Sequence, residues 1–521
     1  MAVPFVSEGG MQPLTHTPRD PPGSTSPPRT SLKYGADEFS APRVSRSWVR
    51  VRLRVMENVL IILSDEHSPR FMGCSGHPVV KTPHLDAIAA AGVRFSNAYT
   101  PSPICVPARA SLATGRWVHQ LGTWGSAEPY RGEQRSWAHI ARAVGYTTAS
   151  IGKLHYGAPT EDHGFDEEIV PMHVVNEVGW VQGLDRSPAA DFPEAYEFAA
   201  DIGIGESSYV SYDRAITAEA VGWINRHGDD DEPWVLLVSF VSPHYPLTVP
   251  QEYWDQYGDA GGPEIGALDE DHPQVQQLAR FFNYHDSFDD ELVRDGRRAY
   301  FGLCSFLDDQ VGKVVNSLDA TGQRDDTTIV YTSDHGDMAG NRGLWAKSYM
   351  YEDSCGVPLL IEGPGVPTDV VCSTPANLVD VHSTVVDLVG GADAGARGSS
   401  LLQLANSPDD PDRVTFSEYH DGGATTGFFM VRSGRWKYVY YVGDRPQLFD
   451  LAADPDELDD LGLSPKHATV RTNLERQLRE IVDPEEVSAR AFEDQAALLA
   501  SFGGLDGIGD QLRFNHTPTP T

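Results

Sequence analysis

The residues from Cys105 to Gly115, Cys-Val-Pro-Ala-Arg-Ala-Ser-Leu-Ala-Thr-Gly, place one cysteine ahead of Pro107 and Arg109 at fixed spacing. Helix-favouring residues follow, and Gly115 predicts the end of a helix. A cysteine at the start of a helix lies near unpaired backbone N–H groups and the positive end of the helix dipole. Arg109, one turn further on, is expected to point back toward it. Such a position stabilises an anionic group or a nucleophile; the alternative is a buried structural cysteine, the usual fate of a free cysteine.

Four apolar runs elsewhere in the chain each end in polar residues. The runs cover residues 58–63, 146–151, 233–241 and 327–332, and they are followed in turn by Asp65 and Glu66, by Lys153 and His155, by His244, and by Asp334 and His335. Such runs predict strands buried on both faces of a parallel sheet. Because the carboxyl ends of parallel strands meet at one edge, we expect these side chains to line one pocket. Each of these residues also has a simpler interpretation when it is considered alone. The acids would then lie in a solvated loop, the Lys-x-His pair would lie on the surface, and the lone histidine would have a structural role.

A pocket with a cation and several positive side chains suits an anionic tetrahedral centre, the sulfur or phosphorus of an ester. Together with Leu112 and Thr114-Gly115, the C-x-P-x-R string resembles the signature of the sulfatase family. The resemblance implies that Cys105 is oxidised to formylglycine by a formylglycine-generating enzyme. In that family one hydroxyl of the hydrated aldehyde attacks sulfur, and the other later expels sulfate. The family usually has Ser before the Arg, and this chain has Ala108; the modifying enzyme is generally described as reading Cys, Pro and Arg.

The resemblance extends over roughly residues 58 to 461 and implies a metal site. Its expected ligands are Asp65, Glu66, Asp334 and His335 with the modified Cys105. The pair Asp65-Glu66 stands where the family usually has Asp-Asp or Asp-Gln. Oxygen-dominated ligands select a hard divalent cation, calcium first, with magnesium or manganese as alternatives. Asp337 is interpreted as loop structure.

The resemblance also implies a role for each remaining polar residue of the pocket. Arg109 and Lys153 are expected to hold the nucleophile, His244 to protonate the leaving oxygen, Lys347 to bind a sulfate oxygen, and His155 to act as the base that releases sulfate. The stretch at residues 162–166, Asp-His-Gly-Phe-Asp, resembles the choline-sulfatase-like branch. A choline ester needs an aromatic or acidic cage for its quaternary ammonium, and none is located in the sequence. Alkyl, aryl and sugar sulfates are therefore all candidate substrates.

The expected activity is therefore hydrolysis of a small sulfate monoester. A phosphonate monoester or phosphodiester hydrolase of the same superfamily is one alternative. The other is a non-catalytic, sulfatase-like binding protein whose Cys105 is never oxidised.

The composition bounds the partners and the surroundings. With 75 acidic and 40 basic residues the net charge is −35, which excludes the basic footprint of a nucleic-acid-binding protein. Lysine occurs only seven times. This acid-rich, lysine-poor composition favours an organism that lives in high salt; the alternative explanation is a GC-rich genome. Five scattered cysteines predict no disulfide framework. We expect no transmembrane helix and no signal peptide, hence a cytoplasmic enzyme. The sequence allows a homo-oligomer and does not decide the oligomeric state.

The order of apolar runs predicts an α/β fold, a large, mostly parallel sheet flanked by helices, followed by a smaller antiparallel sheet with a helix. The resemblance implies that the large part is alkaline-phosphatase-like. The expected divisions are a disordered extension over 1–55, unless translation starts at Met56, a catalytic domain over 56–410, a small C-terminal α+β domain over 411–505 and a flexible tail over 506–521. Residues 166–230 are expected to be insert loops that shape the pocket. Their aromatic residues either face a substrate or fill a core, and the core is the favoured interpretation for Trp180, Tyr196, Phe198, Tyr209 and Tyr212. Residues 251–290 are expected to be loop-rich.

Overall fold

The computed structural model describes residues 57–175, 178–192, 195–228, 232–258, 261, 271–283, 288–504 and 516–519. The predictions of a disordered extension and of a start at Met56 lie outside the described residues. Most of the predicted flexible tail also lies outside them, as does the side chain of Tyr196.

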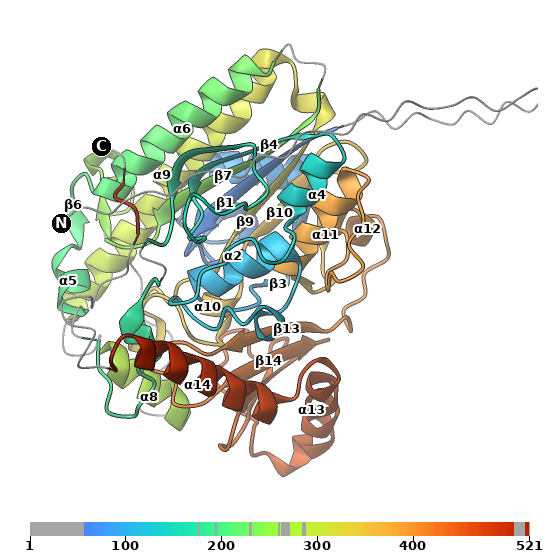
Figure 1. Cartoon of the computed structure of the whole chain (residues 1–521). Helices are drawn as coiled ribbons and strands as arrows, with labels where there is room; N and C mark the ends of the chain where they lie inside the picture. The colour runs from blue at the N-terminus through green and yellow to red at the C-terminus, as the bar shows by residue number, and fades with distance from the viewer. Residues whose placement is uncertain are drawn as a thin grey trace, which may run out of the picture. The chain divides into compact units, whose positions relative to one another are not determined.

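One eight-stranded sheet organises the molecule (Figure 1). Its strands, in spatial order, are β11 (Val370–Cys372), β2 (Val93–Phe95), β10 (Leu359–Glu362), β9 (Thr327–Ser333), β1 (Asn58–Asp65), β7 (Trp234–Pro243), β4 (Thr147–Lys153) and β5 (Glu167–Met172). Strand β10 runs antiparallel to both of its neighbours, and the other pairings are parallel. The expected large, mostly parallel sheet is confirmed.

The central strands are apolar on both faces because helices cover both. On β1, Leu60 and Ile62 pack in a cluster with residues of α6 and α9, whereas Val59 and Ile61 pack with residues of α2, α4 and α11. Figure 1 shows α6 beside α9 on one side of the sheet and α2, α4 and α11 on the other. This two-sided burial explains the continuous apolar runs of the sequence.

The helices of the described residues have the following bounds: α1 (Pro83–Ala91), α2 (Cys105–Thr114), α3 (Val118–Leu121), α4 (Trp137–Ala143), α5 (Ala195–Ala200), α6 (Ser208–Arg226), α7 (Gln251–Trp254), α8 (Pro273–Phe282), α9 (Asp290–Thr321), α10 (Glu352–Cys355), α11 (Leu378–Leu388), α12 (Leu401–Ala405), α13 (Ala468–Ile481) and α14 (Pro484–Ser501). Two short strand pairs, β3 (Ala98–Tyr99) with β12 (Ala376–Asn377) and β6 (Gly203–Ile204) with β8 (Thr248–Val249), complete the connections. No helix within the described ranges is long and apolar enough to cross a membrane.

The small sheet is antiparallel, as expected. It consists of β13 (Thr415–Tyr419), β14 (Phe428–Ser433), β15 (Trp436–Tyr441) and β16 (Gln447–Asp450). Phe429 and Val431 of β14 pack with Leu474 and Leu478 of α13. The sequence predicts one helix with this sheet, and the structure packs two against it, α13 and α14.

The prediction of insert loops over 166–230 is wrong at β5, which is a strand of the large sheet, at α5 and over residues 208–226. Residues 208–226 form α6, which buries Tyr212, Ile216, Ala220 and Trp223 against β7 and α9. Their i, i+3 and i, i+4 spacing is the helical signal that the acidic composition obscured. Trp180, Phe198 and Tyr212 are core residues, as predicted. The loop prediction for 251–290 is likewise wrong at α8, which buries Val275, Leu278 and Phe282 among its apolar residues.

Candidate active site

The polar residues that follow β1, β4, β7 and β9 come together at the carboxyl edge of the sheet, as predicted. Asp65 ends β1 and Lys153 ends β4, while His244 and Asp334 come directly after β7 and β9. Parallel register brings the strand ends level, with Asp65 opposite Pro243 and Ser64 opposite Ser333. Cys105 is the first residue of α2, whose C-terminus is capped by Gly115 in the left-handed conformation, as the sequence predicted.

Cys105 lies against two of the expected metal ligands. Its Sγ is 3.2 Å from His335 Nε2 and 3.6 Å from Asp65 Oδ1. Burial, together with the nearby negative charge of Asp65, raises the pKa of the thiol to about 12. The helix start therefore does not produce a thiolate here, because desolvation of the charged form outweighs the favourable dipole.

Arg109 joins the strand ends to one another and does not hydrogen-bond the cysteine. Its Nε donates to Asp334 Oδ2 at 2.7 Å and its Nη2 to Asp65 Oδ2 at 3.1 Å. Its Nη1 donates to the carbonyl oxygen of Lys153 at 2.7 Å and to Ser239 Oγ at 2.9 Å. The expectation that Arg109 points back at Cys105 is corrected: two buried carboxylates attract the guanidinium more strongly than a neutral thiol does.

Asp65 is the most strongly paired acid of the site. Both Arg109 and Lys153 form ion pairs with its Oδ2, and all three side chains are buried. Burial alone would raise the pKa of Asp65, but the charges of Lys153 and Arg109 hold it well below its ordinary value. Asp65 is therefore an anion at neutral pH.

Glu66, Lys347 and His244 form a second group beside the first. Lys347 Nζ donates to Glu66 Oε2 at 3.0 Å and to His244 Nε2 at 2.6 Å, and His244 Nε2 is 3.2 Å from the same carboxylate oxygen. Since His244 Nδ1 lies 2.6 Å from the carbonyl oxygen of Tyr245, the ring carries its proton on Nδ1 and accepts through Nε2. Burial and the charge of Lys347 hold the pKa of His244 well below its ordinary value, so the ring is neutral.

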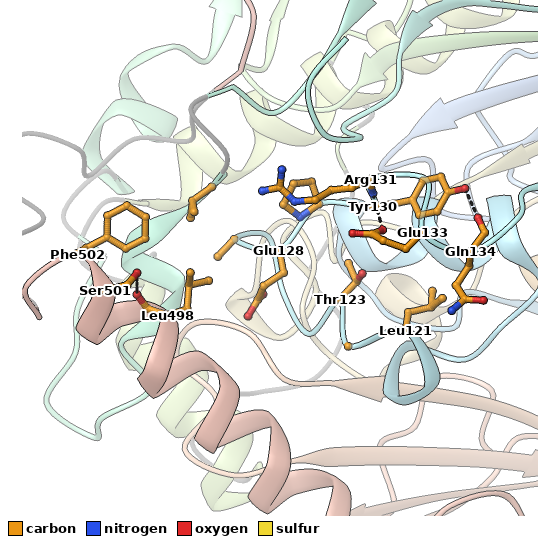
Figure 2. A pocket seen from close by; sticks show the side chains of 14 residues that line it. Leu121, Thr123, Glu128, Tyr130, Arg131, Glu133, Gln134, Leu498, Ser501 and Phe502 are labelled. Atoms are coloured by element: carbon orange, nitrogen blue, oxygen red, sulfur yellow. Dashed lines mark hydrogen bonds between the residues drawn. The ribbon is translucent and has the colours of Figure 1, made fainter. Parts of the chain in front are cut away.

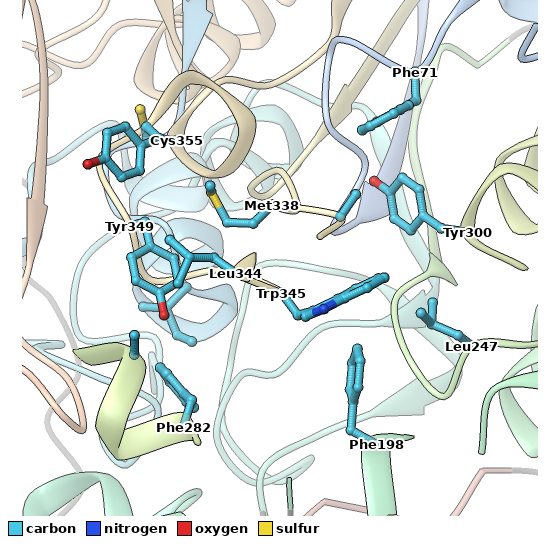
Figure 3. Close-up of a cluster of buried hydrophobic side chains, with 14 of the residues drawn as sticks. Phe71, Phe198, Leu247, Phe282, Tyr300, Met338, Leu344, Trp345, Tyr349 and Cys355 are labelled. Carbon is cyan, nitrogen blue, oxygen red and sulfur yellow. The ribbon is translucent and has the colours of Figure 1, made fainter. Parts of the chain in front are cut away.

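The loop that carries Lys347 is anchored in an aromatic core (Figure 3). Met338, Leu344, Trp345 and Tyr349 lie on either side of Lys347 in sequence and are almost completely buried. In Figure 3 Trp345 lies between Leu344 and Phe198. Asp337 accepts the backbone N–H groups of Ala339 at 2.6 Å and Ala346 at 3.1 Å. Lys347 is thus held in place by its own loop, and Asp337 has the structural role expected of it.

His155 is buried near the site but does not share the geometry expected for it. Lys153 and His155 are two residues apart, a spacing that predicts one shared face in an extended segment. His155 instead has a φ of 55°, which breaks the strand alternation. Burial, with the charges of Lys153 and Arg109, holds its pKa well below its ordinary value. Its role as a base stays a prediction.

The side chains present fit a divalent cation. One oxygen of Asp65, one of Asp334, His335 Nε2 and Cys105 Sγ all lie within 4.8 Å of one another. The second oxygens of both carboxylates are taken by Arg109, which leaves Oδ1 of each on the side of His335. Glu66 does not belong to this set of four, but its Oε1 is buried without a hydrogen-bond partner among the described residues. That orphaned oxygen is an additional donor for a cation.

Three residues near the site were not predicted to take part in it. Ser239 of β7 hydrogen-bonds Arg109, Tyr245 stacks on the His244 ring with centroids 4.2 Å apart, and the ring of Tyr209 is 6.0 Å from that of His244. Lys347 Nζ lies 4.8 Å from the centroid of Tyr245. Tyr245 follows His244 directly, which was the one sequence signal available for this aromatic contact.

A cavity of about 520 Å³ lies elsewhere in the molecule (Figure 2). Tyr130, Arg131, Glu128 and Phe502 are among its lining residues. None of the residues predicted for the active site lines it. The chemistry is therefore concentrated at the strand ends and not in this cavity.

Comparison with known proteins gives the following matches. The family description "Sulfatase" matches residues 57–392, and "N-sulphoglucosamine sulphohydrolase, C-terminal" matches residues 340–483. A choline-sulfatase of Rhizobium meliloti (strain 1021) is 35% identical over 483 residues, which cover 88% of this chain and 93% of that protein. An arylsulfatase K of Danio rerio is 30% identical over 459 residues, covering 83% of this chain and 84% of that protein.

Solved structures share the fold at lower identity. The phosphonate monoester hydrolase of Agrobacterium radiobacter has a TM-score of 0.66 and 24% identity, covering 82% of this chain and 95% of its own. BT4656 in complex with its substrate D-glucosamine-2-N,6-O-disulfate has a TM-score of 0.66 and 21% identity, covering 84% of this chain and 98% of its own. The first family match contains every residue predicted for the active site.

Proposed function

This chain belongs to the sulfatase family and is a sulfuric ester hydrolase, and we propose that its nucleophile is a formylglycine made from Cys105. The observation that carries the proposal is the position of Cys105 Sγ, 3.2 Å from His335 Nε2 at the convergence of the strand ends. Burial raises the pKa of the thiol to about 12, with Asp65 adding to the effect, so an unmodified Cys105 would stay protonated and unreactive. The hydrated aldehyde supplies a hydroxyl nucleophile without a thiolate.

Asp65, Asp334 and His335, with the oxygen that replaces Sγ, would hold one divalent cation, and Glu66 is a further candidate ligand. We propose Ca²⁺ because the donors are mainly oxygen, with Mg²⁺ and Mn²⁺ as the metals to compare. When bound, the cation supplies positive charge to the sulfuryl oxygens and to the nucleophilic oxygen.

The chain's own cations are proposed to divide the remaining work. Arg109 and Lys153 fix the Asp65 carboxylate and so the geometry around the nucleophile. Lys347, on its anchored loop, binds a sulfate oxygen. His244 assists the leaving oxygen, and its proton comes through the 2.6 Å hydrogen bond from Lys347, because the isolated ring is neutral. His155 is proposed as the base that releases sulfate.

The substrate is proposed to be a small sulfate monoester. Because the relatives include a choline-sulfatase and an arylsulfatase K, alkyl and aryl sulfates are the first candidate substrates, to be compared with sugar sulfates.

We further propose maturation by a formylglycine-generating enzyme and a cytoplasmic location. All five cysteines are unpaired in the structure, which supports a reducing compartment. The net charge of −35 supports the proposal that the chain comes from a salt-loving organism. An enzymatic activity that rises with added salt would support it further. Homo-oligomerisation is left to a measurement of mass in solution.

The first experiment is mass spectrometry of the peptide that contains Cys105, from protein coexpressed with a formylglycine-generating enzyme. We expect an aldehyde in place of the thiol, and Cys372→Ser, at another buried cysteine, serves as a control that leaves the modification unchanged. An unmodified thiol under conditions that convert a control sulfatase would overturn the nucleophile assignment. Turnover of an aryl sulfate compared with a phosphonate monoester on the modified protein then separates sulfatase from phosphonate hydrolase activity.

A further inference from the structure

A second cluster of side chains able to ligate a metal lies on β5 and on the residues just before and after it. His163 Nδ1 is 2.9 Å from Glu168 Oε1, and His173 Nε2 is 2.8 Å from Glu168 Oε2. One donor atom from each of the three residues lies within 4.8 Å of the other two. The two imidazole rings stack, with centroids 5.4 Å apart. Both histidine side chains are buried, and the Glu168 side chain is 17% exposed.

The backbone is irregular where it builds this cluster. Glu168 and His173 are five residues apart and would lie on opposite faces of a regular strand. The register between β4 and β5 shifts, since Ile151 pairs with Ile169 but Lys153 pairs with Met172. This bulge inserts one extra residue and restores Glu168 and His173 to the same side. Val170, inside the bulge, has a φ of 43°, a costly conformation for a β-branched residue.

The outer nitrogens of the two histidines show that hydrogen bonds alone do not satisfy the cluster. If both rings donate to Glu168, His163 Nε2 and His173 Nδ1 are left as lone pairs, and both atoms are buried without a hydrogen-bond partner among the described residues. His163 Nε2 then faces Glu161 Oε2 at 3.8 Å, and that oxygen is also buried without a partner in the part of the chain that is described. A lone pair facing a carboxylate is repulsive.

A cation between the inner donors removes this conflict. The inner nitrogens would then offer their lone pairs, and the proton of His163 would move to Nε2, where it faces Glu161. A ligating histidine that donates its other N–H to a carboxylate is the usual outer arrangement of metal sites. Glu161 is itself held by Arg131, whose Nη1 donates to Glu161 Oε1 at 3.0 Å.

We propose that His163, Glu168 and His173 form a second metal site, separate from the catalytic one, for a borderline divalent cation such as Zn²⁺. Two imidazoles and one carboxylate are a donor set that zinc accepts, with water in the fourth position. The catalytic set is richer in oxygen and favours a harder cation, so the two sites select different metals.

The position of the site indicates a bracing role. The backbone N–H groups of Leu154 and His155 both donate to the carbonyl oxygen of Met172, at 3.1 and 2.8 Å, next to His173. The backbone N–H of Thr517 donates to the carbonyl oxygen of His173 at 3.0 Å. A metal at this cluster would therefore fix the segment that follows Lys153 and hold the 516–519 segment to β5. It would touch no reacting atom.

The chain contains a matched control. Glu418 also lies between two histidines, with Oε1 2.8 Å from His119 Nδ1 and Oε2 3.1 Å from His420 Nε2. This trio is not among the groups of described residues whose donor atoms all gather within 4.8 Å. It has similar hydrogen bonds and the same residue types without the metal geometry.

The test is Co²⁺ titration of chelator-stripped, full-length protein carrying Asp334→Asn, which removes a ligand of the catalytic set. We expect one equivalent of Co²⁺ with the intense visible absorption of a low-symmetry site, displaced by Zn²⁺. Adding Glu168→Gln or His173→Gln should weaken binding by more than about 100-fold, because even outer-shell changes cost 10–100-fold. Adding His119→Gln should leave it unchanged. Absence of the Co²⁺ band, or equal binding in all variants, would overturn the proposal.

A second measurement does not depend on the variants folding. Crystals of the chain without substitutions, soaked in Zn²⁺, should show an anomalous-scattering peak at the zinc edge, located between the three side chains. A peak at the catalytic set with none at His163 and His173 would also overturn the proposal.

Discussion

Asp65 and Glu66 are neighbours in sequence and both are completely buried, yet their surroundings move their pKa values in opposite directions. Burial favours the neutral form of both. At Asp65 the charges of Lys153 and Arg109 reverse that effect and hold the pKa well below its ordinary value. At Glu66 the charge of Lys347 does not reverse it, and the pKa is raised well above its ordinary value.

The difference comes from how many cations each carboxylate touches. Asp65 Oδ2 forms ion pairs with both Arg109 and Lys153, whereas Glu66 shares Lys347 with the neutral His244. The negative charge of Asp337 also acts on Glu66. The backbone separates the two acids as well, because Glu66 has a φ of 69° and leaves the line of β1. Adjacent acids at a strand end are therefore not equivalent ligands: one is a fixed anion, and the other is a carboxyl whose charge depends on what binds beside it.

The largest expected effect separates the two acids directly. Asp65→Asn should lower kcat/KM by about 10³- to 10⁴-fold, because a proposed metal ligand is lost and a catalytic cation contributes several kcal/mol. Glu66→Gln should cost only about 10–100-fold, the range for groups that support a ligand set. Steady-state kinetics and metal analysis of the two proteins provide the measurement. Equal losses of activity and metal in both variants would mean that Glu66 is a full ligand.

The second effect concerns stability on the Asp65 side. Arg109→Gln leaves the buried carboxylates of Asp65 and Asp334 without their shared cation and should lower the free energy of unfolding by about 3–5 kcal/mol. Arg476→Gln is the control, because Arg476 pairs with Glu480 on the surface of α13, where the two side chains are 62% and 61% exposed. That change should cost about 1 kcal/mol or less. Urea unfolding of metal-free protein measures both, and similar losses would contradict the buried network.

The third effect concerns the Glu66 side, where His244 is proposed to assist the leaving oxygen. His244→Gln should lower kcat by about 10²-fold for an alkyl sulfate, the lower end of the range for general acid catalysis. It should have little effect on an aryl sulfate with an acidic phenol, whose leaving group needs no proton. Comparing kcat for the two substrates tests this role. A loss of the same size for both esters would show that His244 only binds or positions the substrate.

The convergence of the site was predictable from sequence because it depends on topology. Apolar runs that end in Asp65, Lys153, His244 and Asp334 become parallel strands, and parallel strands bring their carboxyl ends to one edge. Where side chains point within that edge was not predictable. Arg109 was expected to face Cys105, but it turns to the carboxylates because only the folded sheet gathers two of them beside it.

Local backbone irregularities explain the other failures. The left-handed φ of His155 and the bulge between β4 and β5 both break strand alternation, and neither leaves a clear mark in the sequence. Helix α6 had a readable spacing of Tyr212, Ile216 and Ala220, but polar residues between them lowered the apparent hydrophobicity of the segment. Tertiary packing against β7 and α9, and not intrinsic preference, selects that helix.

The smallest expected effect is the pH dependence of stability in metal-free protein, and it tests the comparison most directly. The folded-state pKa of Glu66 is raised, so the unfolded chain releases this proton first as the pH rises above about 4.3. Each further pH unit then costs the native protein about 1.4 kcal/mol until the raised pKa is passed. The free energy of unfolding of the Glu66→Gln variant should therefore rise relative to that of the unsubstituted protein by about that amount per pH unit.

Asp65 behaves in the opposite way, since its lowered pKa gives a stabilisation that is complete above about pH 5 and is lost only in more acidic solution. The stability difference for Asp65→Asn should therefore be constant between pH 5 and pH 8, as measured by urea unfolding with chelator present. A constant difference for Glu66→Gln over the same range would mean that the two carboxylates titrate alike, and the contrast between them would be lost.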